Sequence, residues 1–134
     1  DDPNAAADDD DAVTLPDFYQ GALATIPVDV TQVAANDGYL QAWIDFNGDG
    51  DFDDVGEQVA TDLQLATGTT GTINVPLAVP ETATTSQTFA RFRWSKTAGL
   101  GATGSIIYGE VEDYALTIKV PLALDLPIEE CTSV

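Results

Sequence analysis

The amino-acid sequence predicts an all-β protein, an antiparallel β-sandwich of about seven to nine strands. Short segments in which apolar and polar residues alternate recur along the chain, and Gly, Pro and Thr separate them. No segment shows the 3.6-residue apolar period of an amphipathic helix. The pattern leaves the strand order open, so a jelly-roll and an immunoglobulin-like arrangement both fit it.

Each expected strand is a run in which every second residue is apolar. In residues 24–30 every even-numbered residue is apolar, and Pro27, which has no N–H to donate, indicates an edge strand or a bulge. Residues 39–46 alternate in the same way and lead directly into an acidic loop. Further strands are expected over residues 58–65, 70–77, 88–95 and 110–120.

Length and composition favour one domain with one core. With 134 residues, of which 44% are hydrophobic, the chain can bury a core but is short for two domains. We expect residues 1–11 to form a flexible acidic segment and residues 12–120 to form the sandwich. Residues 121–134 are expected to be a linker or a strand that is added to this sheet or donated to another.

The charge of the chain excludes several classes of partner and of enzyme. The chain has 4 Lys and Arg in total but 23 Asp and Glu, so its net charge of -19 repels nucleic acid and favours the binding of cations. Because there is no His and Cys131 is the only Cys, His-based catalysis, a Cys/His zinc site and an internal disulfide are excluded. A glycosidase with two carboxylates is chemically open, but no motif selects a pair, and we expect no enzyme.

The sequence is typical of an exported protein. No stretch approaches the roughly 18 apolar residues of a membrane helix, so we expect no membrane insertion. The chain begins at Asp1 without Met, which fits a processed protein or a piece of a longer one. We therefore expect a secreted or cell-surface location.

Residues 45–57 contain the strongest chemical signal in the chain. Side-chain oxygens occupy alternate positions around Gly48 and Gly50, and this spacing allows a short loop to aim several oxygens at one hard cation. The helical EF-hand places a Glu at the twelfth loop position, whereas here Gly56 stands there and Glu57 follows. Because a predicted strand precedes the loop, we interpret it as an EF-like calcium loop on β-structure.

The expected Ca²⁺ ligands are the oxygens of this alternating set. They are Asp45, Asn47, Asp49, Asp51 through its carbonyl, Asp53 and Glu57. Asp54 is expected to face solvent. The alternative is an acidic turn without an ion, although six acidic groups in thirteen residues would repel one another strongly.

Acidic residues also fall on the apolar face of the last expected strand. Glu110 and Glu112 share their parity with the apolar residues that follow them. Buried carboxylates need partners, and Arg91 and Arg93 are two of the four cations in the chain.

Several ordered motifs resemble the GEVED domain family, a module of bacterial secreted and cell-surface proteins. Residues 108–114 read Tyr-Gly-Glu-Val-Glu-Asp-Tyr, and residues 42–50, 56–57 and 90–95 carry the other landmarks in the same order. The resemblance extends over roughly residues 8–118. It implies a β-sandwich embedded in long exported proteins, with calcium binding and an adhesive or scaffolding role, and it implies no reaction.

Two roles compete for the acids of the GEVED motif, Glu110, Glu112 and Asp113. They could pair with Arg91 or Arg93 inside the sandwich, or one could complete the calcium sphere. We predict that Glu112 pairs with Arg93 and that Asp113, whose parity differs, is the additional calcium ligand.

The leading functional interpretation is a calcium-stabilised structural or interaction module of an exported bacterial protein such as an adhesin, matrix protein or filament. Its partners would be neighbouring domains or subunits. The alternative is a calcium-dependent carbohydrate-binding module, in which exposed aromatic rings would stack on sugars. The candidate rings are Tyr19, Tyr39, Trp43, Trp94 and Tyr108.

Overall fold

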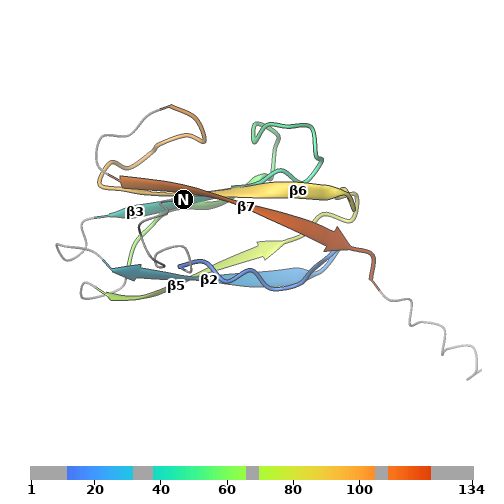
Figure 1. The fold of residues 1–134 in the computed structure, drawn as a ribbon, viewed down its shortest axis with the longest axis horizontal. Coiled ribbons are helices and arrows are strands. Elements are labelled where there is room, and N and C mark those ends of the chain that lie inside the picture. The colour runs from blue at the N-terminus through green and yellow to red at the C-terminus, as the bar shows by residue number, and fades with distance from the viewer. Residues whose placement is uncertain (1–11, 32–37, 66–69, 105–108, 122–134) are drawn as a thin grey trace, which may run out of the picture.

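The computed structural model describes residues 12–31, 38–65, 70–104 and 109–121, and this part of the chain is all-β, as predicted (Figure 1). It contains seven strands and no helix, and therefore no helix that could cross a membrane. The strands are β1 (Phe18–Tyr19), β2 (Leu23–Thr31), β3 (Tyr39–Ile44), β4 (Gln58–Leu63), β5 (Thr70–Ala78), β6 (Gln87–Ser95) and β7 (Gly109–Lys119).

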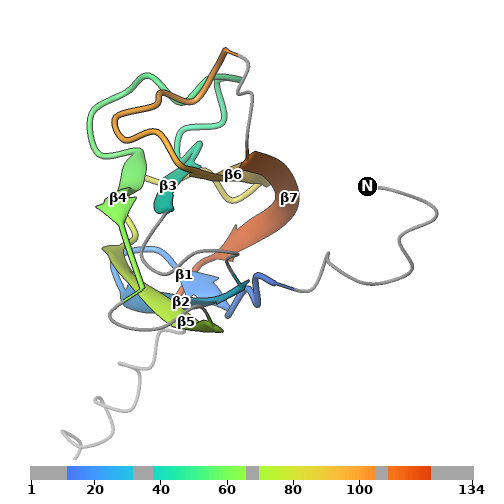
Figure 2. The same cartoon turned by 90° about the vertical axis from the view of Figure 1, so that its left-hand side faces the viewer.

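The strands form two sheets that lie one above the other (Figures 1 and 2). The larger sheet has the order β1-β7-β6-β3-β4, and the smaller sheet consists of β2 and β5. All pairs are antiparallel except β1 with β7, so the prediction of purely antiparallel sheets is wrong for this pair. β1 has only two residues, too few to show an alternating pattern in the sequence.

The first described residues connect the two sheets at one side. Val13 forms a bridge with Val28 of β2, and the Asp29 amide donates to the carbonyl of Ala12 at 2.8 Å. A few residues later Phe18 pairs with Ile118 of β7. The chain thus leaves the edge of the smaller sheet and joins the edge of the larger one.

The core lies between the sheets and follows the predicted alternation. In β2 the even-numbered residues from Ile26 to Val30 are buried, and in β5 the odd-numbered residues from Ile73 to Leu77 are buried. They face apolar side chains of the larger sheet. The buried apolar residues that this sheet contributes to the core are Phe18, Leu40, Ala42, Ile44, Ala60, Ala90, Phe92, Leu116 and Ile118. Removal of this apolar surface from water is the main force that holds the sheets together.

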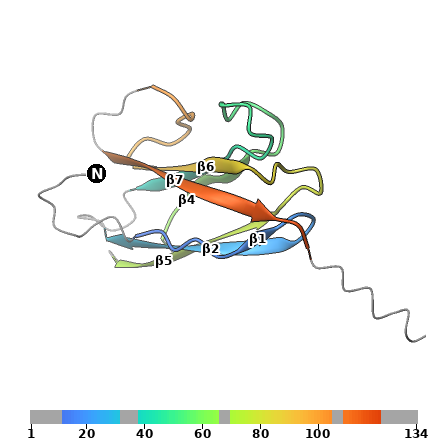
Figure 3. The ribbon, with the colours of Figure 1, turned by 45° about the vertical axis from the view of Figure 1, so that its right-hand side comes forward.

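Two loops cover the outer face of the larger sheet (Figures 1 and 3). They comprise residues 45–57 and residues 96–104, and both project away from β2 and β5. Under them Gln41 and Trp43 are buried although they point away from the core. The interior strand β3 is therefore buried on both faces, whereas its alternation predicts a half-buried strand.

Gly38, which precedes β3, lies against the indole of Trp94, and its substitution tests this packing. A Cβ at Gly38 would lie 2.1 Å from the Trp94 ring, so one of the two must shift. We expect Gly38→Ala to lower the free energy of unfolding by about 1–3 kcal/mol, the usual cost of overpacking. Urea unfolding measures this loss. Gly101→Ala is the control, because a Cβ at Gly101 meets no atom within 4 Å; equal stability of the two variants would contradict the packing.

Candidate metal centre

Backbone hydrogen bonds fix both ends of the 45–57 loop at one end of the larger sheet. The Ile44 amide donates to the carbonyl of Glu57 at 2.9 Å, and the Asp45 amide donates to that of Phe89 at 3.0 Å. The buried hydroxyl of Thr88 donates to the Asp45 carbonyl at 2.7 Å. Asp45 and Glu57, which begin and end the loop, are thereby held next to each other.

Within the loop three polar side chains turn back onto the backbone two residues later. Asn47 Oδ1 accepts from the Asp49 amide at 3.2 Å, Asp49 Oδ1 accepts from the Asp51 amide at 3.1 Å, and Asp51 Oδ1 accepts from the Asp53 amide at 2.9 Å. Gly50 has a φ of 93°, a backbone conformation that costs little only for Gly. These three turns hold the alternate side chains against the backbone of the loop.

Three of the predicted ligands meet at the base of the loop. Carboxylate oxygens of Asp45, Asp49 and Glu57 lie within 4.8 Å of one another. Asp45 is 4% exposed and Glu57 is 2% exposed, whereas Asp49 is open to solvent. The Asp45 carboxylate accepts from the Gly50 amide at 2.9 Å and from the Asp49 amide at 3.2 Å.

The carboxylate of Glu57 is destabilised in its charged form by burial and by its acidic neighbours. Burial raises its pKa above the ordinary 4.5, and the charges of Asp45 and Asp54 act in the same direction. The amides of Asp54 and Asn47 oppose the shift through weak hydrogen bonds of 3.3 and 3.5 Å. The ion pairs Arg91–Asp113 and Lys119–Asp17 do not involve Glu57. A bound cation would remove this cost, because it would neutralise carboxylates that water reaches poorly.

A second group of carboxylates lies on the exposed side of the loop. It consists of Asp49, Asp51 and Asp54, whose oxygens also approach within 4.8 Å of one another. Asp54 is exposed, as expected, but its carboxylate also accepts from Asn47 Nδ2 at 2.6 Å. Sequence reasoning missed this role because Asp54 interrupts the alternate spacing. Among the described residues Asp53 joins neither group.

The donor set of the loop suits a metal ion. It offers two overlapping groups of carboxylate oxygens and the amide oxygen of Asn47, and it contains no His or Cys. Hard cations prefer such oxygen-only sites, whereas zinc and copper favour His and Cys. The buried pair Asp45 and Glu57 supplies the charge that would hold the ion at the base of the loop.

Asp113 pairs with Arg91, and this pair changes the predicted roles of the GEVED motif acids. Arg91 Nε and Nη2 donate to the two carboxylate oxygens of Asp113 at 2.7 and 2.8 Å. This hydrogen bond raises the pKa of Arg91 further. Asp113 stands directly opposite Arg91 in the β6–β7 register, so both side chains point to the outer face. Asp113 is therefore the ion-pair partner of Arg91, and it belongs to neither carboxylate group of the described residues.

The predicted pairing of Glu112 with Arg93 is wrong. Glu112 stands opposite Phe92 and faces the core side, where its carboxylate accepts from the Tyr114 hydroxyl at 2.5 Å. Arg93 faces the outer side and is 1% exposed. Its guanidinium donates to the carbonyls of residues 101, 103 and 104, the last two at 2.8 Å. Adjacent positions on paired strands point to opposite faces of the sheet, which separates these two residues.

Comparison with protein families agrees with the motifs. The GEVED domain model matches residues 39–117, from the start of β3 to two residues before the end of β7. The chain belongs to the GEVED domain family. Searches of curated proteins and of solved structures gave no match. Within this GEVED domain the motif divides its acids between two faces: Asp113 holds Arg91 on the outside, and Glu110 and Glu112 point inward.

Glu57→Gln tests whether the buried carboxylate is costly without an ion. A folded-state pKa above the unfolded value means that stability is full at low pH and falls as the pH rises through the folded pKa. At pH 7 in excess chelator we therefore expect Glu57→Gln to stabilise the fold, on the order of 1 kcal/mol. In millimolar calcium it should be the less stable protein, because it lacks one ligand charge. Thermal unfolding in both conditions measures this reversal, and destabilisation of equal size in both would show a purely structural role.

Proposed function

We propose that this GEVED domain is a calcium-stabilised structural or interaction module of an exported bacterial surface or extracellular protein. The observation that carries the proposal is the buried pair Asp45 and Glu57 beside Asp49, with their oxygens within 4.8 Å. Family membership supports a domain that works as part of a larger protein. The role we infer is mechanical: the ion ties the β3–β4 loop down and stiffens one end of the domain.

Calcium is the favoured ion for reasons of geometry. Ca²⁺ accepts six to eight oxygens at about 2.3–2.6 Å in irregular arrangements, whereas Mg²⁺ demands an octahedron at about 2.0–2.1 Å and retains its water. Residues 45–57 form an irregular loop with many oxygens, which suits the larger ion. The extracellular range of calcium dissociation constants, about 10⁻⁴–10⁻³ M, is sufficient for a module that is permanently exposed to calcium.

The strand order supports an immunoglobulin-like sandwich over a jelly-roll. β2 pairs with β5, while β7, β6, β3 and β4 lie side by side in the other sheet, and the first described residues pass from one sheet to the other. We infer that the two sheets act as one rigid body with loops at both ends, a shape suited to stacking in series.

The aromatic residues give the carbohydrate alternative little support. Trp43 is 4% exposed and packs against Phe52, with ring centroids 6.5 Å apart. Trp94 is half-buried and packs against the core. Tyr108 lies outside the described residues. Residues 122–134 also lie outside them, so their expected role as a linker or donated strand stays a sequence prediction.

Native mass spectrometry tests the proposal directly. After exchange from millimolar calcium we expect at least one bound Ca²⁺ in each chain and none after treatment with chelator. Asp49→Asn should lose the ion, because Asp49 belongs to both carboxylate groups. Glu81→Gln removes the same charge from an exposed turn outside the loop and should retain it. Equal calcium loading of the two variants would contradict the site.

A further inference from the structure

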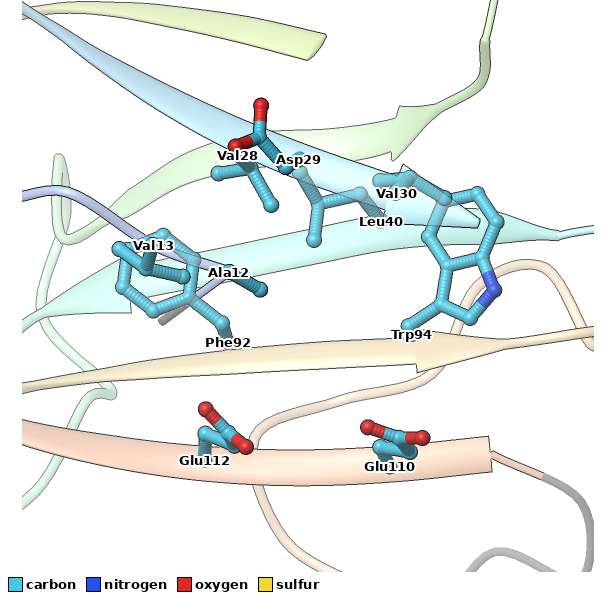
Figure 4. Close-up of a pocket in the computed structure, with 10 residues that line it drawn as sticks. All are labelled: Ala12, Val13, Val28, Asp29, Val30, Leu40, Phe92, Trp94, Glu110 and Glu112. Atoms are coloured by element: carbon cyan, nitrogen blue, oxygen red, sulfur yellow. The ribbon is translucent and has the colours of Figure 1, made fainter. Parts of the chain in front are cut away.

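A cavity of about 100 Å³ opens between the two sheets beside β7 (Figure 4). Its walls come from the core-facing sides of β2, β3 and β6 and from the segment that crosses between the sheets. The apolar lining residues are Ala12, Val13, Val28, Val30, Leu40, Phe92 and Trp94. Asp29, Glu110 and Glu112 complete the lining, so an apolar space lies beside carboxylates.

The edge of β7 next to this cavity is open within the described part of the chain. β1 pairs with β7 only at Ile118 and Lys119, at the far end of the strand. From Glu110 to Ala115 the other side of β7 pairs with β6. An open edge presents backbone N–H and C=O groups that can pair with another extended chain.

Glu110 and Glu112 point from this edge toward the cavity (Figure 4). Glu110 stands opposite Trp94 and Glu112 stands opposite Phe92, so each carboxylate lies beside an aromatic residue of the neighbouring strand β6. The nearby arginines do not neutralise them, because Arg91 and Arg93 occupy the other face of β6 and serve Asp113 and the 101–104 loop. Lys119 is bound to Asp17 beyond the end of the open edge.

We propose that the edge of β7 binds an extended segment of a partner polypeptide and that the cavity takes a Lys or Arg side chain of that segment. The partner backbone would pair with β7 between Glu110 and Ala115. Its aliphatic stem would lie against Phe92 and Trp94, and its charge would sit between the two glutamates. Main-chain pairing gives affinity in such a mode, and the pocket gives specificity. The proposal deepens the interaction role proposed above and does not depend on the calcium loop.

Charge and chain direction disfavour the tail of this protein as the occupant. Residues 120–134 contain no Lys or Arg, and their apolar positions would face Glu110 and Glu112. β1 also blocks the start of a hairpin in which the tail would fold back along its own β7. A basic segment of another protein could occupy the same groove, and its Lys or Arg would pair with the carboxylates of Glu110 and Glu112 as they become buried.

Three peptides test the proposal against the isotope-labelled chain of residues 1–134 in millimolar calcium. The probe is acetyl-Val-Thr-Lys-Thr-Val-amide, which places its Lys and both Val side chains on one face of a strand. The controls replace Lys with norleucine, which keeps the stem and removes the charge, or with Glu. We expect the Lys peptide to shift the amide signals of residues 110–115 in a saturable way, at least about tenfold more tightly than norleucine does. The Glu peptide should not bind.

Variants of the two glutamates separate specific binding from general attraction to an acidic protein. Glu110→Gln/Glu112→Gln should weaken the Lys peptide at least about tenfold, and Glu110→Gln alone, at an exposed position, keeps the test valid if the double variant misfolds. Glu81→Gln should have no effect. Equal binding of the Lys and norleucine peptides, equal loss in Glu81→Gln, or no saturable shift at about 5 mM peptide would each overturn the proposal. Calcium loading is measured separately, so the two proposals fail independently.

Discussion

Addition of calcium to the chelated protein is expected to raise its melting temperature by roughly 10 °C. An ion at 100 times its dissociation constant adds about 2.7 kcal/mol to the free energy of unfolding, and for a domain of this size each kcal/mol is worth about 3–5 °C. The physical source is the removal of repulsion between Asp45, Asp49 and Glu57, two of which are buried. Differential scanning calorimetry in a calcium titration measures the shift and its concentration dependence.

Variants of the loop assign the shift to its carboxylates. Asp49→Ala should remove most of it, because Asp49 is shared by both carboxylate groups. Asp54→Ala should leave most of it, since Asp54 lies only in the exposed group. Magnesium at the same concentration should give a smaller shift, because an irregular loop fits its octahedral demand poorly. A melting temperature indifferent to both calcium and chelator would refute calcium stabilisation.

Sequence periodicity anticipated most of the strands for a clear reason. Each of the six longer strands has one face on the core, so burial imposes a period of two that is visible without a structure. The observed bounds, for example Thr70–Ala78 against the predicted 70–77, differ by one or two residues. β1 was not predicted because two residues cannot show a period. Its parallel pairing with β7 depends on the path of the chain, which no local pattern encodes.

The acidic loop of residues 45–57 was predictable to the level of its alternate oxygens, but the membership of each carboxylate group was not. Spacing predicts that Asp45, Asp49 and Glu57 converge, and the structure brings them together. Asp54 joins the exposed group through the turn after Asp53, which depends on local backbone angles. The pairing of Asp113 with Arg91 was missed for a different reason. Arg91 and Asp113 both alternate with core residues, so their shared outer face was readable from the sequence once β6 and β7 are taken as neighbours.

Arg93 is a fully buried cation whose hydrogen-bond partners are neutral backbone carbonyls. It is 1% exposed, and its Nη atoms donate to carbonyls of residues 101, 103 and 104. Arg91 adds a donor to the Ala102 carbonyl at 2.8 Å. The two arginines thus hold the 96–104 loop onto β6 with hydrogen bonds from charged groups, which are stronger than neutral ones.

Arg93→Met is therefore expected to lower the free energy of unfolding by about 2–4 kcal/mol, because it leaves several carbonyls of the loop without a donor at a site that water reaches poorly. Arg91→Met is the matched control. Its pair with Asp113 is partly exposed, with side-chain exposures of 27% and 48%, so its loss should cost only about 1 kcal/mol. Arg93→Lys should recover a minor part of the loss, since an ammonium cannot reproduce the planar fork. Urea unfolding at fixed millimolar calcium measures all three variants under the same calcium concentration. Faster hydrogen exchange at residues 99–104 in Arg93→Met would place the loss in the loop, and equal costs for the Arg91 and Arg93 variants would show that burial of Arg93 contributes nothing to the fold.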